Sequence, residues 1–104
     1  MLLDFIKKLF GPGIDFKALI EQGALIVDVR TPQEYREGHI PQSQNIPLDQ
    51  LRNKIADLKK KNKPVITVCR SGSRSGMAKS ILNQAGLEVY NGGPWTSLGR
   101  KMLS

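Results

Sequence analysis

Hydrophobic residues along the chain alternate between short continuous runs and patterns with helical spacing. Continuous apolar runs, which are typical of buried strands, occupy residues 25–29 and 65–68, and shorter strands are expected at 44–46 and 87–90. Between these runs, apolar residues recur every three or four positions, which predicts helices. The resulting order of strand, helix, strand and helix predicts an α/β fold with a mainly parallel sheet covered by helices on both faces. Ligands of such folds bind beyond the carboxyl ends of the strands.

Start signals place two of the helices. Thr31, Pro32 and Glu34 form a capping box with proline at the first helical position, so a short helix is expected from residue 32 to about residue 37. Pro47 leads into a further helix, whose apolar residues keep one face. These apolar residues are Leu48, Leu51, Ile55 and Leu58.

Two more helices are predicted in the last third of the chain. One begins after residue 72 and stops at Gly86, and the other follows a turn at residues 92–95. The residues expected to face inward from these helices are Met77, Ala78, Ile81, Leu82, Ala85, Trp95, Leu98 and Met102.

Cys69, the only cysteine in the chain, stands where an apolar run gives way to a loop of small polar residues. The loop opens a helix, so its backbone N–H groups can converge on one point, to which the helix adds positive dipole. An anionic sulfur at that point would be stabilised. Helix starts normally favour acidic residues, so Arg70 and Arg74 beside this one indicate an oxyanion substrate.

A lone cysteine at the end of a buried strand is more often a small hydrophobic residue than a reactive one. The residues after Cys69 reverse that expectation. A structural strand end needs neither two arginines nor two loop serines and a glycine immediately before a helix. A nucleophilic thiolate is therefore the preferred interpretation.

Composition limits the class of protein. The 104 residues, 39% of them hydrophobic, fit one compact domain. One cysteine excludes an internal disulfide and one histidine argues against a metal site, so we expect no metal and a reducing, cytoplasmic setting. The net charge of +7 suits small anionic substrates. The lysines near residue 60 fit the end of a helix, so we expect no nucleic acid partner. We also expect a monomer.

Residues 1–13 are predicted to be an amphipathic segment and linker ahead of a single domain at 14–104. The apolar residues of MLLDFIKKLF span one broad face of a helix. No stretch approaches the roughly 20 apolar residues that span a bilayer, so membrane contact would be peripheral. We expect residues 1–10 to dock on the domain's own core, with a membrane surface or a partner as the alternative, because two lysines attract anionic lipid only weakly.

Three groups of residues together resemble the single-domain rhodaneses, which are thiosulfate sulfurtransferases and related persulfide carriers. The resemblance covers about residues 14–103 and implies a three-layer α/β/α fold. At Gln42 and Ser43 the chain departs from the family, which more often has glycine and alanine there, but these positions belong to a turn. The three groups are Asp28-Val29-Arg30 with Glu34-Tyr35, Gly38-His39-Ile40-Pro41 and Asn45-Ile46-Pro47, then Cys69-Arg70-Ser71-Gly72-Ser73-Arg74-Ser75, and last Gly92-Gly93 with Trp95.

The resemblance implies a mechanism. The Cys69 thiolate would attack the outer sulfur of thiosulfate, expel sulfite and become a persulfide, from which a thiol or cyanide takes the sulfur without any cofactor. Backbone N–H groups of the loop would hold the sulfur anion, and the two arginines would bind the donor. The residues expected to bind substrate are Arg70, Ser71, Gly72, Ser73, Arg74 and Ser75.

Asp28 and Arg30 follow another parallel strand, so they are expected near the same rim. We expect Asp28 to tie Arg74 or the loop backbone in place rather than to act in catalysis. Glu34 can simply complete its capping box. His39 matches a family histidine regarded as structural, and a thiolate held by backbone N–H groups needs no general base.

Other classes remain as alternatives. Tyrosine-phosphatase-type loops place arginine six positions after the cysteine and usually histidine before it, whereas Arg74 is one position short and Val68 precedes Cys69. Rhodanese-fold phosphatases carry one more loop residue, which makes room for phosphate, and an arsenate reductase would use a thiol donor. An inactive binding module usually lacks the cysteine. The physiological donor and acceptor stay open.

Overall fold

A four-stranded parallel sheet forms the centre of the molecule in a computed structural model that describes residues 13–103. The strands lie in the order β2-β1-β3-β4, and every pairing is parallel, as predicted. Their bounds are Leu25–Asp28 for β1, Gln44–Asn45 for β2, Val65–Cys69 for β3 and Val89–Pro94 for β4.

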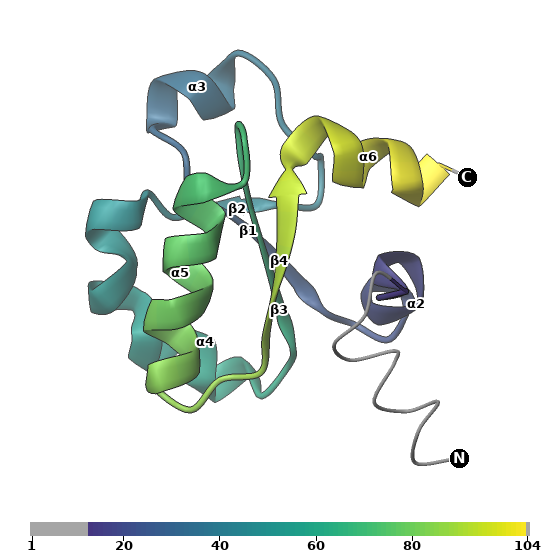
Figure 1. Cartoon of the computed structure of the whole chain (residues 1–104). Coiled ribbons are helices and arrows are strands. Elements are labelled where there is room, and N and C mark those ends of the chain that lie inside the picture. The colour runs from purple at the N-terminus through teal and green to yellow at the C-terminus, as the bar shows by residue number, and fades with distance from the viewer. Residues whose placement is uncertain (1–12, 104) are drawn as a thin grey trace, which may run out of the picture.

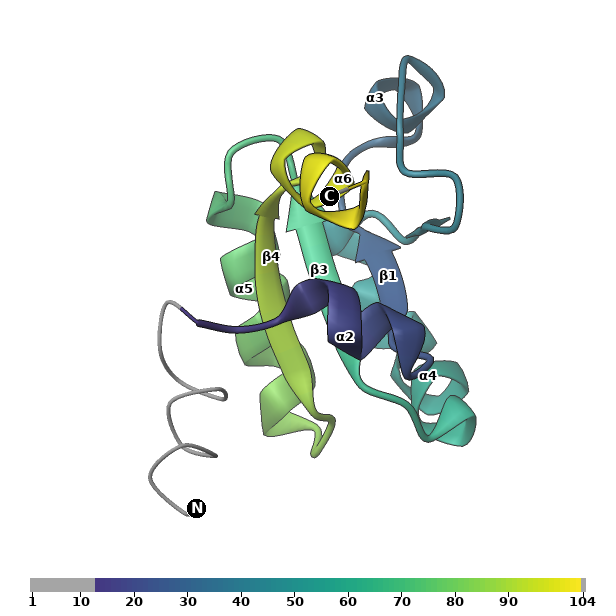
Figure 2. The ribbon, with the colours of Figure 1, turned by 90° about the vertical axis from the view of Figure 1, so that its right-hand side faces the viewer.

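Helices cover both faces of this sheet, which confirms the three-layer α/β/α arrangement (Figures 1 and 2). One face carries α4 and α5 and the other carries α2 and α6, while α3 lies beyond the carboxyl ends of the strands. The bounds are Phe16–Glu21 for α2, Pro32–Arg36 for α3, Ile55–Lys61 for α4, Ser73–Gln84 for α5 and Trp95–Leu103 for α6, with a 3₁₀ helix η1 at Leu48–Lys54.

Alternation along β3 divides the core between the two layers. Val65 and Cys69 pack in the cluster that contains residues of α4 and α5, whereas Ile66 and Val68 pack in the cluster that contains residues of α2 and α6. The Cys69 side chain therefore lies on the face of the sheet that α5 covers. Cys69 is also the last residue of β3, the strand that precedes α5 in the chain.

The segment after Pro47 is not the single α-helix that the apolar spacing predicts. It begins as the 3₁₀ helix η1 and becomes the α-helix α4 only at Ile55. Pro47 supplies no capping side chain, and the N–H of Leu48 is bound to the carbonyl of Val29 beside the sheet. The start of the segment is therefore held by the sheet rather than by a helix cap.

Residues 92–95 do not form the predicted turn, because β4 continues through them to Pro94. Thr67 pairs with Asn91 and Val68 with Gly93, so Gly92 is an extra residue in a β-bulge. A Cβ atom on Gly92 would lie 2.8 Å from a methyl carbon of Ile66, so only glycine fits this position. The bulge lets β4 remain paired with β3 as far as Pro94.

Met77 is another exception to the predicted inward faces. Ala78, Leu82 and Leu98 are buried, but Met77 is 51% exposed. It lines a groove of about 730 Å³ between η1 and α5 instead of packing on the sheet.

The prediction for residues 1–10 lies outside the described residues. Among residues 13–103, no helix combines the length and the apolar character that a membrane span requires.

Candidate active site

Cys69 ends β3, and its sulfur lies beneath the first turn of α5. The Sγ atom accepts hydrogen bonds from the backbone N–H of Gly72 at 2.9 Å and of Ser75 at 3.3 Å. The hydroxyl of Ser75 lies 3.3 Å from the same sulfur. Gly72 has φ of 103°, a conformation that favours glycine and lets the loop curl around the sulfur. The sulfur thus faces a set of donors at a helix N-terminus, where negative charge is stabilised.

These donors change the acidity of the cysteine. Burial raises the pKa of the Cys69 thiol, because a charged sulfur is poorly solvated there. Hydrogen bonds from the Ser75 hydroxyl and from the N–H groups of Ser75, Gly72 and Ser71 outweigh burial, so the pKa lies below its usual value of 9.0. A depressed thiol pKa is the property that a nucleophilic cysteine requires.

The other predicted loop residues differ in their exposure to solvent. Arg70, Ser71 and Ser73 are exposed. Within residues 13–103, Arg70 forms no ion pair, so its guanidinium is available to an anion in solvent. Arg74 is half-buried and already has a partner.

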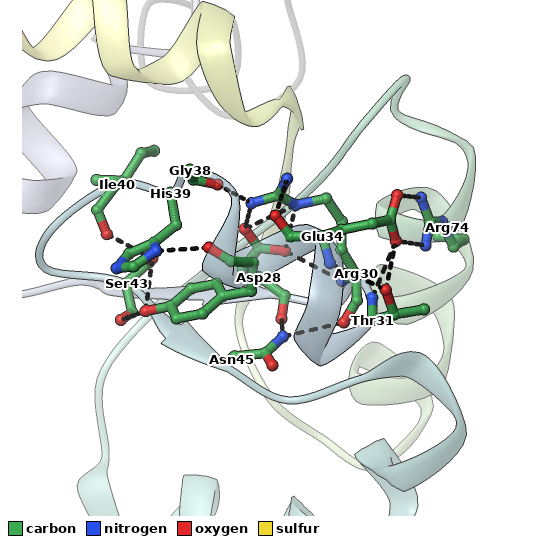
Figure 3. Close-up of polar contacts among 11 residues, drawn as sticks. Asp28, Arg30, Thr31, Glu34, Gly38, His39, Ile40, Ser43, Asn45 and Arg74 are labelled. Carbon is green, nitrogen blue, oxygen red and sulfur yellow. Dashed lines mark hydrogen bonds and ion pairs between the residues drawn. The ribbon is translucent and has the colours of Figure 1, made fainter.

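Arg74 is held by Glu34 of α3. Its Nη1 and Nη2 atoms donate to the two carboxylate oxygens of Glu34 at 2.7 and 3.0 Å, as Figure 3 shows. Glu34 also accepts the N–H of Thr31 in its capping box. The Arg74 guanidinium and the Thr31 N–H lower the pKa of Glu34 to about 2, and Glu34 in turn raises the pKa of Arg74. Glu34 thus does more than complete a capping box, because it ties α3 to residues 69–75, which are called the cysteine loop below.

The expectation that Asp28 would hold Arg74 or the loop is wrong. The carboxylate of Asp28 is fully buried and pairs instead with Arg30, whose Nη2 lies 2.7 Å from its Oδ2 (Figure 3). Arg30 also donates to the carbonyl oxygens of Glu34 and Gly38, and its guanidinium lies 4.7 Å from the Trp95 ring centre. Because Arg30 stands two residues after Asp28, it turns back to neutralise that buried charge before any distant arginine can. The pair supports residues 32–39, which comprise α3 and the turn after it and are called the α3 segment below.

His39 belongs to the same segment. Its ring stacks on Tyr35 at 3.7 Å between centroids, and its Nδ1 donates to the Tyr35 carbonyl oxygen at 2.7 Å. Both contacts stay within the α3 segment, in agreement with a structural role.

One residue of the site, Asn91, is not indicated by the sequence pattern. Its side chain binds the carbonyl of Gly72, the N–H of Gly93 and the hydroxyl of Ser75. An asparagine before two glycines is typical of a turn. In the structure β4 runs on past the predicted strand end at residue 90, and Asn91 pairs with Thr67 in the same register, which brings its side chain beside the cysteine loop.

Replacing Glu34 with glutamine is expected to lower the melting temperature by about 5 °C, which corresponds to about 1 kcal/mol for a partly exposed ion pair in a small domain. Glutamine still suits the capping box, so the change isolates the pair with Arg74. Because the folded-state pKa of about 2 lies below the usual 4.5, the pair stabilises the fold above pH 4.5 and is lost as the pH falls toward 2. Melting curves should therefore show the difference between wild type and variant shrinking across that window.

The control for this experiment is Glu37→Gln, which removes the same charge from an exposed residue of the same segment. Equal effects of the two changes at neutral pH, or a difference that persists at pH 2, would contradict the role of the Glu34–Arg74 pair.

The sequence is similar to several bacterial proteins. It is 39% identical over 69 residues to thiosulfate sulfurtransferase PspE of Escherichia coli, with 64% of this chain and 66% of that protein covered. It is 40% identical over 78 residues to thiosulfate sulfurtransferase GlpE of Pseudomonas syringae, with 72% and 71% covered. Uncharacterized protein YqhL of Bacillus subtilis is 41% identical over 69 residues, with 65% of this chain and 54% of that protein covered. The chain thus matches only about half of YqhL and about two thirds of PspE.

Solved structures resemble it as well. A rhodanese with anions from E. coli has a TM-score of 0.67 at 35% identity, with 72% of this chain and 91% of that one covered. Reduced CoADR-RHD of Bacillus anthracis has a TM-score of 0.71 at 31% identity, with 86% of this chain and 16% of that one covered. The family model of the rhodanese-like domain matches residues 14–93. With the cysteine loop at the end of a parallel strand, these likenesses show that the chain belongs to the rhodanese-like domain family, whose relatives include sulfurtransferases.

Proposed function

We propose that this protein is a sulfurtransferase that carries a sulfane sulfur on Cys69 from thiosulfate, or from a persulfide donor, to a thiol or cyanide acceptor. The observation that carries the proposal is the set of N–H and O–H donors around Sγ, which lowers the pKa of the thiol. The names of PspE and GlpE support thiosulfate as a donor.

The reaction proceeds in two displacements on sulfur. The Cys69 thiolate attacks the outer sulfur of thiosulfate, a new S–S bond forms, and the old S–S bond breaks as sulfite leaves with its electron pair. The acceptor then attacks that outer sulfur, and the Cys69 thiolate leaves. With cyanide the product is thiocyanate, and the cysteine is restored without any net oxidation of the protein.

The loop residues have different roles in this proposal. Backbone N–H groups of Gly72 and Ser75 stabilise the thiolate before attack and after discharge. Arg70, exposed on the loop, attracts the anionic donor and the leaving sulfite. The charge of Arg74 is paired with that of Glu34, so Arg74 holds the start of α5 to α3. Asp28 and Arg30 lie at the end of β1 and hold α3 through the carbonyl oxygens of Glu34 and Gly38, rather than entering the chemistry.

The proposal includes a cytoplasmic location. A single unpaired cysteine that acts as a thiolate suits the reducing cytoplasm.

A persulfide carrier that hands its sulfur to a partner protein is the second candidate function, because it would need the same loop.

Mass spectrometry of the protein incubated with thiosulfate is expected to reveal a species heavier by about 32 Da, the mass of one sulfur atom, that disappears on addition of cyanide. The same treatment of Cys69→Ala protein should give no such species. Steady production of thiocyanate would favour the enzyme, while a stable adduct that discharges only to a protein thiol would favour the carrier. The absence of any adduct after incubation with thiosulfate and, separately, with a persulfide donor would contradict both the enzyme and the carrier.

A further inference from the structure

Asn91 makes three hydrogen bonds beside the cysteine loop. Its Nδ2 donates to the carbonyl oxygen of Gly72 at 3.2 Å, and its Oδ1 accepts the N–H of Gly93 at 2.9 Å. A carbonyl can only accept and a backbone N–H can only donate, so these contacts determine which end of the amide is the oxygen. That oxygen lies 2.7 Å from Oγ of Ser75. An amide oxygen has no proton, so Ser75 must be the donor of this bond.

The Ser75 hydroxyl has one proton and two neighbours that can receive it. Its Oγ lies 3.3 Å from Sγ of Cys69 as well as 2.7 Å from Oδ1 of Asn91. While Cys69 is a thiol, its S–H can donate to Oγ and Ser75 can donate to Asn91, so all three groups are satisfied. Ser75 is fully buried, so solvent does not replace either bond.

Ionisation of Cys69 breaks this arrangement. The thiolate has no proton to give and is stabilised by donors, and Ser75 can donate to it only by turning away from Asn91. Asn91 and the thiolate therefore compete for one proton.

We propose that Asn91 is a positioning residue. By accepting the proton of the Ser75 hydroxyl, it determines how readily that hydroxyl donates to the Cys69 sulfur. The inference rests on the proposed function, which it deepens by naming the group that limits formation of the nucleophile. When Sγ becomes bonded to a second sulfur it loses its charge, and the hydroxyl returns to Asn91. When the thiolate leaves again on discharge, the hydroxyl turns back to the sulfur.

The test compares Asn91→Leu with Asn91→Asp. Both variants lose the donor to Gly72, so any loosening of the loop is common to them. Leucine cannot accept the Ser75 proton, so the pKa of Cys69 should fall by about half a unit to one unit. Aspartate accepts that proton more strongly and adds negative charge, so the pKa should rise by about one unit. Ionised tyrosine absorbs in the same ultraviolet range as a thiolate, so each protein is titrated beside its Cys69→Ala counterpart. Because the chain has one cysteine, the difference in absorbance between the two, followed against pH, reports Cys69.

Ser75→Ala supplies the control. In that background the shift caused by Asn91→Leu should vanish, because the hydroxyl through which Asn91 acts is gone. Shifts of the same sign in both Asn91 variants, or a leucine shift that survives in the Ser75→Ala background, would overturn the proposal. If the leucine variant does not fold, an unshifted pKa in the aspartate variant overturns it.

The titration follows ionisation and not sulfur transfer, so its outcome is independent of turnover. Opposite shifts in a protein that forms no persulfide would support the role of Asn91 and contradict the proposed function alone. Persulfide formation without opposite shifts would contradict the role of Asn91 alone.

Discussion

Replacing Cys69 with serine is expected to abolish sulfur transfer from thiosulfate to cyanide while leaving the fold in place. A serine hydroxyl cannot form a persulfide, and the chain has no second cysteine to take over. Serine has nearly the same shape and can accept the N–H bonds from Gly72 and Ser75 that now reach the sulfur. Thiocyanate formation should fall to the uncatalysed rate, with a melting temperature close to that of the wild type.

Ser80→Ala is the matched control, because Ser80 is an exposed residue farther along α5. It should retain wild-type turnover. Thiocyanate production by Cys69→Ser at a rate near wild type would remove Cys69 from the mechanism.

Replacing Arg70 with alanine should lower kcat/KM for thiosulfate by about 10- to 100-fold, since a charge-assisted contact to the donor is lost. Arg70 is the stronger choice for this role because Arg74 is already bound to Glu34. The loss should be smaller with a persulfide donor that carries less negative charge than thiosulfate. It should also narrow at high salt, where the attraction of wild type for thiosulfate is screened.

Lys60→Ala removes the same charge from an exposed residue of α4, outside the cysteine loop, and controls for net charge. Arg70→Lys should keep part of the activity, because the charge remains while the planar guanidinium is lost. Unchanged kcat and KM in Arg70→Ala would mean that this arginine is only solvated.

Much of the fold could be predicted because its signals are local. The capping box of Thr31 and Glu34 forms as expected, since each partner lies within one helical turn of the other. The apolar run that became β3 is buried at every residue, so its continuous pattern left little choice of element. The 3₁₀ start of η1 was not predictable, because the start of the segment is held by a hydrogen bond to Val29, just after β1, which the spacing of leucines does not express.

The partners of the charged residues were harder to predict than the residues themselves. Asp28, Arg30 and Arg74 were predicted near the site and Glu34 only in its capping box, but two acids and two bases near one rim can pair in more than one way. The choice was settled by reach, because Arg30 folds back onto Asp28 and leaves Arg74 to Glu34. Asn91 was missed for a related reason, since β4 extends beyond the apolar run at residues 87–90 and its partners in space are not visible in the sequence.

The attachment of α3 has a consequence for native-state motion. None of its residues is buried, so α3 is attached largely by polar bonds, chiefly those of Arg30 and Glu34. Its amides can therefore exchange with solvent through local opening, while those of β3 wait for global unfolding. Each such opening would separate Glu34 from Arg74 and free that guanidinium to swing toward an arriving anion, so a brief local fluctuation would alter the charge presented at the mouth of the site.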